Sequence, residues 1–188
     1  VIVDIDDNFE MIDPLSEMYH AYGTQEVLLP DGSHLWKDGQ NGFSVKKNTE
    51  RLEKYKDILR NATVITTTTF KLRQHALQFN KNVVVIPNSI DSQFFPEMPK
   101  RTGTLDIVWA GGSSHYSDLM EIKDPLTRIL NKYPDVHLHI LGVPFKGFVR
   151  DMPEKQLHTY GWVSPDGHGY RLATLRAHIG LCPLKDMH

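Results

Sequence analysis

The most informative part of the chain reads Leu105-Asp-Ile-Val-Trp-Ala-Gly-Gly-Ser-Ser-His115. Its first half is a short, β-branched apolar run, which is typical of a strand buried in a parallel sheet. Two glycines and two serines then lead into a helical pattern. Small residues at the carboxyl end of such a strand let a ligand approach the backbone, and the amide groups at the start of the next helix attract phosphate. The stretch therefore predicts a diphosphate site, although a tight turn capped by serine has the same pattern.

Similar strand patterns recur on both sides of this stretch. The predicted strands are Val1–Ile5, Ala62–Thr67, Val83–Ile86, Leu105–Ala110, Val136–Leu141, Leu157–Tyr160 and Ile179–Cys182. Helical patterns separate them: 49–60 behind the cap candidates Asn48 and Thr49, 70–79, a helix after Ser117, and 169–177 with Leu172 and Leu175 on one side. We expect the third helix to break before Pro125, with Asp124 as a new cap, because proline cannot donate a helical hydrogen bond. Strands alternating with helices predict parallel βαβ units and hence a doubly wound α/β fold.

The alternation stops between Pro87 and Gly103, where three prolines occur without any periodicity. This composition favours a connector, so we predict two Rossmann-like units, residues 1–99 and 104–188. The apolar opening Val1-Ile-Val3 predicts a strand buried on both faces, which needs sheet neighbours. The last strand pattern also ends close to the last residue, and we therefore expect the chain to be a piece of a larger protein.

Composition excludes several classes of protein. The 188 residues carry a net charge of −2, with 40% hydrophobic and 23% charged residues, which excludes a disordered or fibrous chain. The near balance of 21 basic and 23 acidic residues argues against nucleic acid as a partner. The sequence has neither an apolar run of about 20 residues nor a signal-peptide pattern, so we expect no transmembrane segment and a cytoplasmic protein. The single cysteine, Cys182, lies between apolar residues and is expected in the core.

Three segments, in this order, resemble the retaining nucleotide-sugar glycosyltransferases of glycosyltransferase family 4, which have the GT-B fold. The first comprises Asn61-Ala-Thr-Val-Ile-Thr-Thr-Thr-Thr-Phe70 and Asn82-Val-Val-Val-Ile-Pro-Asn-Ser-Ile-Asp91 with a following phenylalanine pair, and it resembles the end of the family's amino-terminal domain and its hinge. The second, Trp109 to His115, resembles the glycine-rich loop of the donor-binding domain. The third, Tyr160-Gly-Trp-Val163 followed by Ile179-Gly-Leu-Cys-Pro-Leu184, resembles the region around the nucleotide base.

The resemblance implies an enzyme that moves a sugar from a nucleoside diphosphate to a glycan, lipid or protein acceptor. It implies retention of configuration, with neither a metal nor another cofactor. Residues 1–99 would be the carboxyl part of the acceptor-side domain, and residues 104–188 the first part of the donor domain. Catalysis would depend on backbone N–H groups and cations that stabilise the leaving diphosphate.

The family's donor-binding positions fall on eight residues of this chain: Gly111, Gly112, Ser113, Ser114, His115, Trp162, Val163 and Lys185. Asp6 and Asp7, at a strand end, are candidates for holding acceptor hydroxyls, or alternatively they cap a helix that begins near Phe9. The family's paired glutamates would fall after His188, and no residue of this chain is assigned as the catalytic base.

Two alternatives come from other classes. Asp4 and Asp6 have the spacing of the nucleophile and the acid–base of haloacid-dehalogenase-like phosphohydrolases, with Thr66 or Thr67 as the second motif. Against this class, Asn8 replaces the usual Thr or Val, and no aspartate pair follows a later apolar strand to hold magnesium. The other alternative is a noncatalytic relative that binds a nucleotide or a glycan.

Two further features have structural and functional interpretations. His137 and His139 lie on one face of a predicted strand, a spacing that suits metal ligands, but hydrogen-bonded core histidines are favoured because no third ligand is evident. Residues 23–48 are too long for a simple loop and are therefore functional or mobile. Within them, Asp31-Gly32 and Asp38-Gly39 predict turns, and Lys46-Lys47 predicts a solvated helix entrance.

Overall fold

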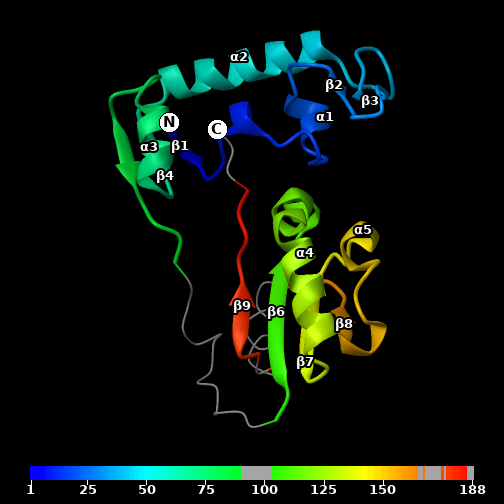
Figure 1. The fold of residues 1–188 in the computed structure, drawn as a ribbon. Helices are drawn as coiled ribbons and strands as arrows, with labels where there is room; N and C mark the ends of the chain where they lie inside the picture. Colours follow the sequence, from blue (N-terminus) through cyan, green and yellow to red (C-terminus); the bar gives the residue numbers. More distant parts are fainter. Residues whose placement is uncertain (90–102, 165–166, 168–174, 176, 186–188) are drawn as a thin grey trace. The chain divides into compact units, whose positions relative to one another are not determined.

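The computed structural model describes residues 1–89, 103–164, 167, 175 and 177–185 (Figure 1). The chain divides into two compact units, Val1–Ser89 and Ile90–His188. This division falls within the segment 87–103, where the strand–helix alternation stops. Each unit is built around a parallel sheet with helices, so the predicted α/β class with Rossmann-like units is confirmed at this level.

The first unit has a parallel sheet in the order β1-β4-β5 and a separate antiparallel hairpin. Its strands are β1 (Ile2–Ile5), β2 (Val27–Leu28), β3 (His34–Trp36), β4 (Val64–Thr67) and β5 (Val83–Val85). Its helices are the 3-10 turn η1 (Phe9–Met11), α1 (Tyr19–Tyr22), α2 (Val45–Asn61) and α3 (Phe70–Ala76). Ile5, Leu59, Ile65, Ala76 and Val83 form its core. The parallel strands match their predicted positions to within two residues.

The first strand differs from its prediction. β1 is an edge strand, and Val1 and Ile2 are 84% and 72% exposed, whereas only Ile5 of β1 is buried. An apolar run therefore does not mean burial on both faces here. β4 pairs with one edge of β1, and among the described residues no strand pairs with its other edge.

Helix α2 begins four residues earlier than predicted. Ser44 is its N-cap and accepts a hydrogen bond from the backbone N–H of Lys47. Asn48, a predicted cap, is instead 3% exposed, and its amide donates to the carbonyls of His20 and Gly23. Asn48 thus connects α2 to the end of α1. Lys46 and Lys47 lie exposed in the first turn, as predicted.

Residues 23–44 contain the hairpin β2–β3 rather than an irregular loop. The predicted turns are confirmed, since Gly32 and Gly39 have φ values of +83° and +78°, which favour glycine. Trp36 of β3 lies in an aromatic cluster with Tyr19, His20 and Phe43. This cluster packs the hairpin against α1.

The second unit has one parallel sheet in the order β8-β7-β6-β9. Its strands are β6 (Leu105–Gly111), β7 (Val136–Gly142), β8 (Leu157–Tyr160) and β9 (Ile179–Leu181). Its helices are η3 (Ser113–His115), α4 (Tyr116–Lys132), α5 (Lys146–Val149) and η4 (Glu154–Gln156). Helix α4 packs on β6 and β7, which lie beside it in Figure 1, through Leu119, Leu126 and Leu130.

Pro125 does not break α4, contrary to the prediction. The helix runs through it without interruption to Lys132, and Asp124 is not a cap. Leu119, Leu126 and Leu130 form one buried stripe on both sides of the proline, which is itself exposed. A proline in a helix interior costs about 3 kcal/mol, whereas burying each leucine stabilises by roughly 1.5–3 kcal/mol. The buried stripe therefore outweighs the proline.

Gln156 closes one corner of the second unit. It is 7% exposed, and its side-chain amide lies 3.0, 3.0 and 2.6 Å from the carbonyl oxygens of Leu130, Tyr133 and Val136. Because a helix leaves its last carbonyls without intrahelical donors, the amide satisfies groups between α4 and β7 that no helical N–H reaches.

Several other predictions concern the last part of the chain. Cys182 is exposed rather than buried, because it follows β9 at the end of the sheet. Most of the predicted helix 169–177, including Leu172, lies outside the described residues. In the described part of the chain, no helix has the length and apolarity needed to cross a bilayer.

Candidate functional site

The order of strands in the second unit reverses at β6. From β6 the chain passes through α4 to β7 on one side, whereas β9 lies on the other side of β6 and pairs with Ile107, Val108 and Trp109. In open parallel sheets, ligands bind beyond the carboxyl ends of the strands at this reversal. The candidate site therefore lies where β6 and β9 end.

The turn after β6 has two glycines with different structural roles. A Cβ on Gly111 would overlap the indole ring of Trp109, so the fold itself requires glycine there. Gly112 is the N-cap residue of η3, and no side chain caps the start of this 3-10 turn. A Cβ on Gly112 would meet no described atom within 4 Å. The fold does not require glycine at position 112, so the space beside it is open to another molecule.

The residues after Gly112 carry polar groups into the start of α4. Ser113 and Ser114 are exposed, and the His115 side chain is 45% exposed. Ser117, in the first turn of α4, is buried, and its hydroxyl has no hydrogen-bond partner among the described residues. The predicted donor residues from Gly111 to His115 thus form one continuous turn at the carboxyl end of β6.

Asp118 links this turn to the segment after β9. One carboxylate oxygen lies 2.8 Å from Nδ1 of His115, and the other accepts a hydrogen bond of 2.8 Å from the backbone N–H of Lys185. Lys185 is thereby brought to the glycine turn. Sequence reasoning missed Asp118, although its spacing of three residues from His115 in a helical segment was a usable signal.

Trp162 and Val163 lie after a strand that does not neighbour β6. They follow β8, which is separated from β6 by β7. Trp162 is 76% exposed and Val163 is partly buried. Both residues follow the carboxyl end of a parallel strand, as Gly112 does, but the described contacts do not join them to the glycine turn.

The predicted acceptor-side carboxylates belong to the first unit. Asp6 and Asp7 are exposed directly after β1. Neither caps the following turn, because Asn8 is the N-cap of η1 and accepts a hydrogen bond from the backbone N–H of Glu10. The structural alternative predicted for Asp6 and Asp7 is therefore wrong.

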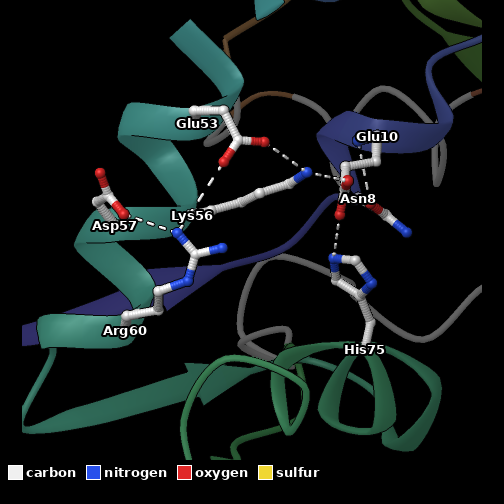
Figure 2. Close-up of polar contacts among 7 residues, drawn as sticks. All are labelled: Asn8, Glu10, Glu53, Lys56, Asp57, Arg60 and His75. Atoms are coloured by element: carbon white, nitrogen blue, oxygen red, sulfur yellow. Dashed lines mark hydrogen bonds and ion pairs between the residues drawn. The ribbon is translucent and has the colours of Figure 1, made fainter. Parts of the chain in front are cut away.

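Charged groups hold the turn that follows Asp6 and Asp7 (Figure 2). Glu10 lies 2.7 Å from the ammonium group of Lys56 and 3.4 Å from Nε2 of His75, so it joins α2 to α3. Hydrogen bonds to Glu10 and Glu53 raise the pKa of Lys56. Burial, aided by Glu10, Tyr22 and Asp7, raises the pKa of Tyr55 to about 12.

Aromatic contacts hold the same turn from another side. Phe9 stacks on Tyr22 at a centroid distance of 4.6 Å and meets the edge of Tyr55 at 5.2 Å. These contacts, with the ion pairs of Glu10, fix the backbone that follows the two exposed aspartates.

Asp4 and Thr66 are paired across β1 and β4, and the Thr66 hydroxyl donates to the Asp4 carboxylate. Thr67 is buried, and its hydroxyl donates to the carbonyl of Thr69. Of the two threonines considered for a phosphohydrolase motif, Thr66 is therefore the one that contacts Asp4.

The histidines of β7 form a polar network on the sheet. His139 lies 2.9 Å from the buried Asp106 and 3.0 Å from the hydroxyl of Tyr160, while His137 lies 2.8 Å from Nε2 of His158. Hydrogen-bonded histidines were the favoured prediction, and it is confirmed. In the described part of the chain, no cluster of His, Cys, Asp or Glu has the arrangement of a metal site.

Comparisons with known proteins give no family: neither the models of known protein families nor the curated proteins contain a match to this chain.

Proposed function

We propose that this chain carries part of a GT-B glycosyltransferase that transfers a sugar from a nucleoside-diphosphate sugar with retention and without a metal. The observation that carries the proposal is the glycine turn at the reversal of strand order, where β6 leads into α4 beside β9. This is the place where parallel sheets bind nucleotides. The resemblance of three segments to glycosyltransferase family 4 supports the same assignment.

In this proposal, the turn from Gly111 to His115 binds the diphosphate. The open space beside Gly112 lets phosphate oxygens approach the backbone N–H groups, and the exposed hydroxyls of Ser113 and Ser114 donate to them. The backbone of Lys185 is bonded to Asp118 in the first turn of α4, and in this proposal its side chain adds a cation to the site. These groups stabilise the negative charge that develops on the leaving diphosphate.

The remaining candidates have more distant roles. Trp162 and Val163 lie beside the base, and the exposed Asp6 and Asp7 accept hydrogen bonds from acceptor hydroxyls. The ion pair of Glu10 and the stacking of Phe9 fix the backbone after β1, which supports this last role. A fixed backbone loses little conformational entropy when its carboxylates bind a ligand.

The difference between the two glycines gives the test. Gly112→Val should leave the fold intact, because a Cβ at this position meets no described atom within 4 Å, and should weaken nucleoside-diphosphate binding more than tenfold, which is about 1.4 kcal/mol. Calorimetry with a panel of nucleoside diphosphates measures this change. Gly111→Ala is the contrasting variant and should lower stability, because its Cβ overlaps Trp109. Equal affinities of Gly112→Val and the parent chain would reject this turn as the phosphate site.

A further inference from the structure

The side chain of Asp118 makes two contacts outside the hydrogen-bonding pattern of helix α4. Its side chain is 17% exposed, and its two oxygens bind partners from different loops: His115 after β6 and the Lys185 backbone after β9. The two loops lie on either side of the point where the strand order reverses. A single carboxylate therefore fixes both sides of the candidate donor site.

We propose that Asp118 is a positioning residue of this site: it holds the His115 ring so that Nε2 faces the phosphates of a bound nucleotide sugar. The inference rests on the proposed function and adds to it a residue that the resemblance does not assign. Asp118 itself need not touch the ligand, since it acts through His115 and through the backbone of Lys185.

The chemistry of the pair fixes the tautomer of His115. An ionised carboxylate only accepts hydrogen bonds, so Nδ1 of His115 carries a proton. Nε2 then accepts a hydrogen bond when the ring is neutral and donates one when the ring is protonated. Among the described residues, no hydrogen bond occupies Nε2. The ring can therefore donate to a phosphate oxygen only when Nε2 also carries a proton.

Aspartate suits this position better than asparagine. The two partners bind different oxygens of Asp118, so in asparagine one of them faces an NH2 group, which donates hydrogen bonds and does not accept them. The negative charge of Asp118 also opposes a bound phosphate directly. Removal of the charge also relieves this repulsion, and we expect the lost positioning of His115 to outweigh that gain.

The test compares the parent chain with Asp118→Asn, His115→Ala and the double variant. We expect Asp118→Asn to weaken nucleoside-diphosphate binding at least about tenfold. Because Asp118 acts mainly through His115, Asp118→Asn should weaken binding less in the His115→Ala background than in the parent chain. The matched control is Glu121→Gln, which removes a carboxylate from an exposed position of the same helix and should leave affinity unchanged.

A second measurement does not depend on nucleotide. Nitrogen-15 NMR of the imidazole should show the Nδ1-protonated tautomer in the parent chain, and Asp118→Ala should shift it toward the Nε2-protonated form. An unshifted tautomer, or equal or tighter binding by Asp118→Asn, would overturn the role of Asp118 alone. Failure of the parent chain to bind any nucleoside diphosphate would instead reject the donor site and this role together.

Discussion

Asp4 is the residue whose replacement separates two kinds of chemistry. Its carboxylate accepts a hydrogen bond from Thr66 within the sheet of the first unit. If Asp4 attacked phosphorus, Asp4→Asn would abolish magnesium-dependent hydrolysis of phosphate esters. We expect no such hydrolysis in the parent chain, and unchanged nucleoside-diphosphate binding in Asp4→Asn, because the glycine turn belongs to the other unit.

The measurement for this prediction is a phosphate-release assay with and without chelator, together with calorimetry. Thr66→Val is the matched control, because it removes the hydrogen bond to Asp4 and keeps the carboxylate. Ester hydrolysis that depends on magnesium and disappears only in Asp4→Asn would replace the glycosyltransferase proposal with a phosphohydrolase.

Single residues were predictable where their role is local. Gly111 and Gly112 stand out because small residues directly after a buried strand indicate a tight turn or a close approach of a ligand to the backbone. The turns at Gly32 and Gly39 follow from backbone sterics alone. Asp118 was missed because its second partner, Lys185, lies far away in sequence. No local pattern encodes that contact.

Among the elements, α4 carries the clearest prediction of stability. Pro125→Ala should increase the opening free energy of α4 by roughly 1–3 kcal/mol, since it restores a helical hydrogen bond at an exposed position. The gain is reduced because proline also restricts the unfolded chain. Hydrogen exchange of the α4 amides measures it. Arg128→Ala, at an exposed position one turn later, should change little, and a Pro125→Ala variant no more stable than the parent would contradict the prediction.

Strands were easier to predict than helix boundaries in this chain. Runs rich in apolar and β-branched residues identify β4 to β7 because such runs fit buried strands. The start of α2 was misplaced because Asn48 has the chemistry of a cap, yet it is buried by contacts with α1 that only the tertiary fold creates. The burial of Leu119, Leu126 and Leu130 likewise explains why α4 continues through Pro125 instead of ending there.

At the scale of the whole molecule, acid should destabilise the second unit. Burial, followed by the charges of His139 and His137, lowers the pKa of His158 below its ordinary value of 6.5, while Asp106 opposes the shift. The folded state therefore binds fewer protons than the unfolded state below pH 6.5, and stability falls as the pH drops through that range. Above this range, His158 does not make the free energy of unfolding depend on pH.

Hydrogen exchange of β7 and β8 between about pH 8 and pH 5 measures this effect. His158→Gln should reduce the slope, because glutamine does not titrate and still forms hydrogen bonds to its neighbours. The same slope in the variant would assign the acid sensitivity to other groups of the network.

The α/β class and the two parallel sheets follow from alternation in the sequence, but the strand order does not. No local pattern encodes that β9 pairs with β6 rather than with β8, and this pairing places Lys185 where its backbone N–H reaches Asp118. The candidate site was therefore predictable as a turn but not as a meeting of two loops.

The amide of Gln156 also sets a minimum length for the second unit. A chain that ended soon after β7 would contain β6, α4 and β7 but would lose the donor that serves the carbonyls of Leu130, Tyr133 and Val136. A buried polar group without its partner costs about 1–3 kcal/mol, a large share of the stability of a small domain. During synthesis, this corner therefore closes only after residue 156 has left the ribosome, and an expression boundary for the second unit belongs beyond that residue.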